Sequence, residues 1–216
     1  MRYPSVTRAV FIDRPNRFVA RVERDGAVEI VHVKNTGRMR ELLLPGARVW
    51  LTPGTNPERK TKYDLIAVEL PDGDTVNIDS QAPNAAALEW LSAQAYDRIV
   101  PEYRYGGSRI DFYAEKAGER FLMEVKGCTL KIGGVGYFPD APTDRGVKHL
   151  RELMRAKAEG YRAAAAFVIQ MNGVAEVRAN RSTHPEFADA LEEARAAGVA
   201  ILMLPCRVSP DGITIV

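Results

Sequence analysis

Two strand-like stretches joined by a short turn decide the fold, and they lie in residues 108–126, which read SRIDFYAEKAGERFLMEVK. Apolar side chains recur at every second position on both sides of residues 116–119, a Gly-containing connection of hairpin length. If these four residues form the turn, Asp111 lies directly opposite Glu124 on one face of the sheet. Lys126 is then a near neighbour, because side chains two positions apart on a strand share a face. The other face is expected to carry Ile110, Phe112, Ala114, Met123 and Val125.

The polar cluster of Asp111, Glu124 and Lys126 admits two interpretations. Two carboxylates whose Cβ atoms lie about 5 Å apart repel each other unless a cation lies between them, so the cluster predicts a metal site. Oxygen ligands of this kind favour Mg²⁺ or Mn²⁺. The alternative is a ladder of cross-strand ion pairs, Arg109 with Glu124 and Asp111 with Lys126, each contributing at most about 1 kcal/mol. Spacing alone does not separate the two.

Length and composition limit the class of protein. The chain has 216 residues, with 46% hydrophobic and 27% charged residues, as in a globular protein of one large or two small domains. It has no apolar run of 18 residues and no visible secretion signal, which predicts no membrane segment. Its two cysteines, Cys128 and Cys206, make no disulfide framework. These features favour a cytoplasmic protein.

Charge is unevenly distributed along the chain. Residues 1–62 contain 13 Lys and Arg against 6 Asp and Glu, whereas residues 63–80 contain five acids and no base. A basic N-terminal portion indicates a polyanionic partner such as DNA, although an ordinary solvated surface has the same composition.

Residues 1–82 predict a small β-barrel of the OB type. Alternating stretches separated by turn residues predict strands at 6–12, 18–23, 28–34, 48–51, 63–69 and 75–78. A short helix is expected over 39–44, where Pro45-Gly46 stops it. Arg and Asn at the turns are suited to contact phosphates and base edges, and turn chemistry alone would also explain the Asn residues. The expected nucleic-acid contacts are Arg14, Asn16, Arg17, Asn35, Arg38 and Arg40.

Residues 83–216 predict a mixed sheet covered by helices on both faces, which makes the chain a two-domain protein of the α+β or α/β class. Asn84 is expected to cap a helix that runs to about Val100. Further helices are expected after a Thr143 cap and from Pro185 to Ala197. The apolar runs at 163–170 and 200–204 predict strands.

The first turns of the helix after Thr143 are cationic. They contain Arg145, Lys148, His149 and Arg151, and cations beside a helix N-terminus hold phosphates well. Arg145 and Lys148 are therefore added to the expected nucleic-acid contacts, with a solvated helix face as the alternative. The three histidines and two cysteines lack zinc-site spacing.

Six ordered segments resemble the sugar fermentation stimulation protein (SfsA) family of bacteria and archaea. They are RPNRF (14–18), HVKNTGRM (32–39), ELLLPG (41–46), SRIDF (108–112), EVKGCTL (124–130) and FPDAPTDRGVKHL (138–150). The resemblance implies an OB-type N-terminal domain joined to a restriction-endonuclease-like domain of the PD-(D/E)XK kind. The family is described as DNA-binding and is linked to sugar-utilisation genes. One departure is His184, where the family pattern leads us to expect Asp before Pro185.

The resemblance also implies a role for each matching position. Asp111 and Glu124 would hold the metal together with the carbonyl of Val125. Lys126 would orient or activate the attacking water and stabilise the charge that develops on the phosphate.

Nuclease domains of this class often take a further acid from the preceding helix, for which Glu89 is the first candidate and Glu102 the second. The function implied is a Mg²⁺- or Mn²⁺-dependent nuclease that acts on DNA, with RNA as a second substrate class. The alternative is a non-catalytic DNA-binding regulator of sugar-utilisation genes.

Overall fold

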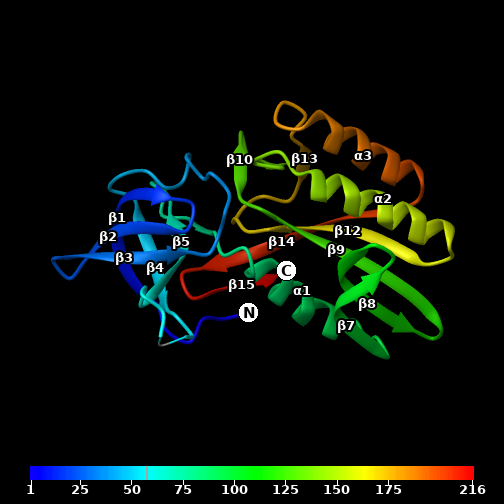
Figure 1. Cartoon of the computed structure of the whole chain (residues 1–216), viewed down its shortest axis with the longest axis horizontal. Helices are drawn as coiled ribbons and strands as arrows, with labels where there is room; N and C mark the ends of the chain where they lie inside the picture. Colours follow the sequence, from blue (N-terminus) through cyan, green and yellow to red (C-terminus); the bar gives the residue numbers. More distant parts are fainter. Residues whose placement is uncertain (57) are drawn as a thin grey trace.

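The first third of the chain is a closed barrel. The structure, a computed structural model, describes residues 1–56 and 58–216. Six strands form a sheet in the order β3-β2-β1-β4-β5-β6. Their bounds are β1 (Thr7–Asn16), β2 (Val19–Arg24), β3 (Ala27–Val33), β4 (Arg48–Pro53), β5 (Tyr63–Glu69) and β6 (Thr75–Asn77). The end of β3 also pairs with β5 in parallel, which closes five strands into a barrel and confirms the predicted architecture (Figure 1).

The prediction of a helix over residues 39–44 is wrong, because this segment forms only turns. The amides of Leu42 and Leu43 both donate to the carbonyl of Met39, at 3.1 and 2.9 Å. Met39 itself has a left-handed backbone, with φ of 47°. A right-handed helix cannot include such a residue, so the segment turns once and stops.

The rest of the chain is built on a second sheet, in the order β15-β14-β12-β9-β8-β7. Its strands are β7 (Arg98–Tyr105), β8 (Ser108–Lys116), β9 (Glu119–Cys128), β12 (Arg162–Ile169), β14 (Ala200–Ser209) and β15 (Gly212–Ile215). The central strands β9, β12 and β14 are parallel, and the outer pairings are antiparallel. A small separate sheet contains β10 (Leu130–Ile132), β11 (Val135–Phe138) and β13 (Val177–Ala179).

Helices cover both faces of this sheet, as predicted. Helix α1 (Ala82–Ser92) packs on one face, whereas α2 (Asp144–Ala158) and α3 (Pro185–Ala196) pack on the other (Figure 1). Thr143 caps α2 as expected, because its hydroxyl accepts from the amide of Gly146 at 3.0 Å. In the described part of the chain, no helix is both long and apolar enough to cross a membrane.

Helix α1 differs from its prediction at both ends. Gln81, rather than Asn84, is its N-cap, and the helix ends at Ser92 instead of continuing to about Val100. The left-handed backbone of Ala95, with φ of 53°, turns the chain away from the helix. Residues 98–105 then form strand β7 at the edge of the sheet.

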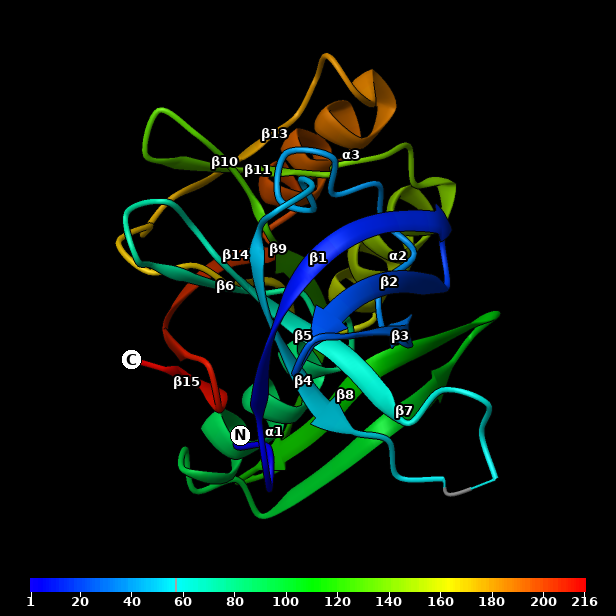
Figure 2. The same ribbon diagram turned by 90° about the vertical axis from the view of Figure 1, so that its left-hand side faces the viewer.

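Gln170, which directly follows β12, joins the barrel to the second sheet. Its buried side-chain amide donates to the Asn77 carbonyl at 3.1 Å, to Asn77 Oδ1 at 3.0 Å and to the Asp79 carbonyl at 3.1 Å. Its own carbonyl accepts from the Asn77 amide at 3.0 Å. Gly127 of β9 lies so close that a Cβ there would overlap the Gln170 amide and lie 2.7 Å from Pro83 Cγ. The joint therefore fixes the barrel and the start of α1 against the end of β9. Figure 2 shows the backbone of the whole chain from the barrel side.

Candidate active site

The hairpin β8–β9 carries the candidate site. Its pairing runs from Lys116 with Glu119 to Phe112 with Met123, which confirms the predicted register. The turn contains two residues rather than four, Ala117 and Gly118, with φ of 50° and 80°. Positive φ at both positions is the signature of the type I′ turn, which matches the twist of two antiparallel strands.

The two strands separate at Asp111. Regular pairing ends at Phe112 and Met123, and beyond it Asp111 Oδ2 accepts from the backbone amide of Val125 at 2.7 Å. Asp111 Oδ1 accepts from Asn84 Nδ2, in the first turn of α1, at 2.8 Å. A side-chain carboxylate thus takes the place of a partner strand. The carbonyl of Val125 faces the same gap, because the N–H and C=O of one strand residue point to the same edge.

The face alternation changes at the same position. Phe112 shares the core beneath α1 with Ala114, Met123 and Val125, whereas Ile110 belongs to the core beneath α2. The expectation that these two residues share a face is wrong. On the neighbouring strand β7, pairing skips Glu102, which has a left-handed φ of 54° opposite Asp111. This irregularity in two adjacent strands rotates the chain between Ile110 and Phe112.

Glu124 points from β9 toward α2 and is 3% exposed. Its Oε1 accepts from Lys126 Nζ at 2.6 Å and from His149 Nδ1. His149 Nε2 accepts from Arg145 Nε at 3.3 Å, so Nδ1 is the nitrogen that carries the proton. Glu124 Oε2 is buried and has no hydrogen-bond partner among the described residues. Oε1 thus accepts two hydrogen bonds, whereas Oε2 accepts none from the described residues.

The electrostatics of the two carboxylates differ. Burial, and after it repulsion from Glu124, raises the pKa of Asp111. Burial also acts to raise the pKa of Glu124, but the His149 hydrogen bond and Lys126 outweigh it and lower that pKa. A buried anion with an open oxygen beside a second repelled carboxylate is the environment that a bound cation stabilises.

The ion-pair ladder, the alternative interpretation of this cluster, does not form. Arg109 Nη1 lies 3.5 Å from Glu102, and Lys126 Nζ bonds to Glu124. Neither predicted pair, Arg109 with Glu124 or Asp111 with Lys126, is present in the described part of the chain.

The oxygen donors available to a metal are few. Residues 1–56 and 58–216 hold no group of three or more His, Cys, Asp and Glu side chains placed to bind an ion. Asp111, Glu124 Oε2 and the Val125 carbonyl offer oxygens, which suit a hard cation that keeps several waters. The residues present therefore fit Mg²⁺ or Mn²⁺ as a partly hydrated ion.

Neither candidate for the additional acid contacts this cluster. Glu89 of α1 is 60% exposed and pairs with the N-terminal ammonium group of Met1 at 2.6 Å. Glu102 lies in β7 rather than in a helix, is 58% exposed and lies against Arg109. The α1 residue that does reach Asp111 is Asn84. Asn84 was predicted only as a helix cap.

Three of the expected nucleic-acid contacts instead hold barrel loops in shape. Arg14 donates to the carbonyls of Gly37 at 2.7 Å, Arg17 at 2.7 Å and Asn35 at 2.6 Å. Asn35 accepts from the Gly37 amide at 2.7 Å and donates to the Ile78 carbonyl at 2.9 Å. Asn16 Oδ1 accepts from the backbone amides of residues 18 and 19. Their hydrogen-bonding groups serve backbone partners, which leaves little capacity for a phosphate.

The other three residues form a free basic edge. Arg17, Arg38 and Arg40 are exposed and line a pocket of about 430 Å³ that also includes Ala141, from the loop before α2. Gly37 brings the two loops together, since a Cβ there would lie 2.5 Å from Asp140 Oδ2. The basic edge of the barrel thus meets the segment that leads into α2.

The two α2 residues are tied to the site region. Arg145 bonds to His149, and Lys148 Nζ donates to the Gly107 carbonyl in the β7–β8 turn at 2.9 Å. Arg145 therefore supports Glu124 through His149, and Lys148 holds the tip of the β7–β8 hairpin.

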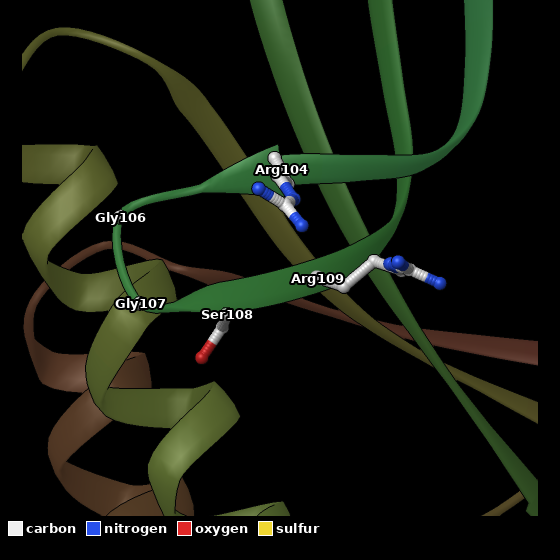
Figure 3. A pocket seen from close by; sticks show the side chains of 5 residues that line it. All are labelled: Arg104, Gly106, Gly107, Ser108 and Arg109. Carbon is white, nitrogen blue, oxygen red and sulfur yellow. The ribbon is translucent and has the colours of Figure 1, made fainter.

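A further basic pair lies at that hairpin and was not predicted, because β7 was not expected. Arg104 and Arg109 are directly paired across the two strands and line a pocket of about 370 Å³ (Figure 3). Ser108 points to the opposite side of the strand in the same view. Like charges facing each other across strands are unfavourable unless an anion lies between them. Arg109 is two residues from Asp111 in β8, and it is paired with Glu102 at 3.5 Å.

Comparison with known proteins identifies relatives along the whole chain. A family described as the sugar fermentation stimulation protein RE domain matches residues 81–212, and one described as the SfsA N-terminal OB domain matches residues 12–78. The sugar fermentation stimulation protein homolog of Desulfitobacterium hafniense (strain Y51) is 49% identical over 216 residues, covering 99% of this chain and 94% of that protein. The homolog of Ruminiclostridium cellulolyticum is 46% identical over 219 residues, covering 100% and 96%.

A solved structure is also similar. It is described as the structure of Pyrococcus furiosus SfsA in complex with Ca²⁺, with a TM-score of 0.87 and 29% sequence identity. The similarity covers 99% of this chain and 96% of that one.

Proposed function

Because the chain belongs to the sugar fermentation stimulation protein family, whose names describe no reaction, we propose from the site that it is a metal-dependent nuclease. It would hydrolyse phosphodiester bonds of DNA, with RNA as a second candidate substrate. The observation that carries this proposal is Glu124 Oε2, a buried carboxylate oxygen beside Asp111 and Lys126 that has no hydrogen-bond partner in residues 1–56 and 58–216. A charge-pair scaffold would not leave a buried acceptor open.

Asp111, Glu124 and the Val125 carbonyl would hold a Mg²⁺ or Mn²⁺ ion. The Pyrococcus furiosus relative is described as a complex with Ca²⁺, another cation that takes oxygen ligands, which supports this assignment. When bound, such an ion lowers the pKa of a water molecule and neutralises charge on the phosphate.

The protein's own groups supply the remaining parts. Lys126, whose side chain is largely buried, would donate a hydrogen bond to a phosphate oxygen and stabilise the negative charge that builds up there. His149 is a positioning residue: it occupies Oε1 of Glu124, so that Oε2 is the oxygen left to a cation. Asn84 and the Val125 amide hold the carboxylate of Asp111 in the same way.

The basic groups around the site suit a polyanionic substrate. Arg104 and Arg109 lie on the hairpin beside Asp111, and the barrel edge adds Arg17, Arg38 and Arg40. Contacts of this kind bind phosphates without regard to sequence and make affinity depend on salt.

The test is incubation of the purified protein with labelled single- and double-stranded DNA and RNA in EDTA, Mg²⁺ or Mn²⁺. Cleavage is expected only with metal. Asp111→Asn, Glu124→Gln and Lys126→Ala should each lower the rate by about 10²-fold or more. Glu89→Gln is the matched control, because this exposed acid pairs with the N-terminal ammonium group, and it should cleave like the wild type.

Two outcomes would contradict the nuclease. One is activity within about tenfold of wild type in all three site variants, with circular dichroism showing intact folds. The other is metal-independent binding without cleavage, together with a preference of about 10³-fold or more for one DNA sequence, which is the behaviour of a regulator.

A further inference from the structure

A pocket of about 190 Å³ lies between the barrel and the first turn of α1, outside the carboxylate cluster. Phe18, His32 and Lys34 line it from the barrel, and Ser80 and Gln81 line it from the start of α1. A cavity of about 150 Å³ holds one benzene ring, so this pocket has room for one planar ring. Of the lining residues, Lys34 is paired with the buried Asp79 at 2.9 Å.

Phe18 presents its ring to solvent from a fixed backbone. The residue is 54% exposed, which is unusual for a large aromatic side chain. Its amide is held by Asn16 Oδ1 at 2.8 Å, and its carbonyl accepts from the Val33 amide at 2.8 Å. A rigid, exposed aromatic ring is the platform on which proteins stack the bases of single strands.

His32 is the second ring at the pocket and is also held in place. Its Nδ1 lies 3.0 Å from Asp64 Oδ1, and Arg59 binds the same carboxylate at 2.5 Å. The far edge of the imidazole is left to meet a polar edge of a ligand. An apolar face beside a polar ring edge matches the two kinds of surface on a nucleobase.

The pocket is coupled to the carboxylate cluster through α1. Ser80 bonds to the Lys34 carbonyl through both its amide and its hydroxyl, at 3.0 and 2.7 Å. Gln81 caps the helix, and three residues later Asn84 contacts Asp111. Three helical residues rise only about 4.5 Å. A strand bound at Asp111 that follows the first turn of α1 would therefore arrive at the pocket.

We propose that this pocket binds an unpaired base of the strand that occupies the carboxylate site, with Phe18 as its stacking surface. The preferred substrate is then single-stranded DNA. This inference rests on the proposed nuclease function for the neighbouring site. A base within a duplex is stacked on both sides, and turning it out costs a few kcal/mol, so the pocket discriminates against duplexes.

The test is the affinity of Phe18→Ala for a single-stranded oligonucleotide and for the matching duplex, by fluorescence anisotropy in EDTA. Loss of one stacked base corresponds to roughly 5- to 150-fold weaker binding of the single strand. Duplex affinity should not change, and Phe18→Trp should restore the single-strand affinity. Val28→Ala is the matched control, because Val28 is an exposed apolar residue of the same barrel, 64% exposed and outside the pocket.

The outcomes separate the pocket from the nuclease. Selective loss of single-strand binding in Phe18→Ala supports the pocket even if the wild type cleaves nothing with any metal. Metal-dependent cleavage by the wild type, with unchanged single-strand affinity in Phe18→Ala, rejects the pocket and leaves the nuclease standing. An equal loss for single strand and duplex, or the same loss in Val28→Ala, also rejects it.

Discussion

Replacing Asp111 with Asn is expected to stabilise the metal-free fold. The burial and repulsion from Glu124 that raise the pKa of Asp111 also destabilise its ionised form. Asn keeps the shape: its oxygen can accept from the Val125 amide, and its amino group can donate to Asn84 once the Asn84 amide is reversed. Stabilising substitutions commonly raise the free energy of unfolding by about 0.5–2 kcal/mol. For a chain of this size, that raises Tm by roughly 1–8 °C.

A bound metal should reverse this difference in Tm, so that the wild type becomes more stable than Asp111→Asn. At 100 times its Kd, a cation stabilises the wild type by about 2.7 kcal/mol, or roughly 5–11 °C in Tm. Asp111→Asn loses one of the two carboxylates and should gain almost nothing. Thermal unfolding followed by circular dichroism, in EDTA and then in Mg²⁺ or Mn²⁺, measures both effects, and Glu89→Gln should follow the wild type. A lower Tm for Asp111→Asn in EDTA, or an equal rise with metal, would refute the reasoning.

Two further predictions follow from side-chain contacts. Arg14→Ala should lower the free energy of unfolding by about 1–3 kcal/mol in urea titrations, because the carbonyls of the 35–38 loop lose their donor. Arg38→Ala should stay within about 0.5 kcal/mol of wild type but flatten the salt dependence of DNA binding by about 0.9 in log–log slope; equal stability losses would contradict this. Cys128 and Cys206 are buried, and burial raises the pKa of each thiol to about 12. Mass spectrometry should find both unalkylated by iodoacetamide in the native protein at neutral pH and alkylated after unfolding; rapid native modification would contradict this.

The hairpin could be predicted because its information is local. Alternation with period two and a Gly-containing turn fix the register within 19 residues of sequence. The point where the two strands separate could not be predicted from the sequence. It depends on Glu102 in β7, a strand that was not predicted, and on Asn84 from a helix packed across the sheet. Ile110 was therefore assigned to the wrong face.

The hydrogen-bond partners of the two carboxylates could not be predicted either, because they lie far from the carboxylates in the sequence. Glu124 and His149 are 25 residues apart and meet only because α2 packs over β9. His149 was predicted as one member of a cationic turn, and such a turn is expected to be exposed. In the structure, the side chain of His149 is buried. Arg14 illustrates the reverse case. Its position in a basic segment suggested a phosphate contact, but its guanidinium group instead binds the carbonyls of Arg17, Asn35 and Gly37 in neighbouring loops.

The Gln170 joint bears on how a substrate could be admitted. Three hydrogen bonds from one buried amide, with Gly127 packed against it, oppose rotation of the barrel relative to β9. For the proposed nucleic-acid substrate, entry would then depend on the flexibility of the strand rather than on a movement of the protein. Duplex DNA resists bending over about 150 base pairs, whereas an unpaired strand can follow a curved path around fixed walls. Discrimination between a duplex and a single strand then needs no closing motion of the protein. Its entropic cost is the conformational freedom that the single strand loses on binding.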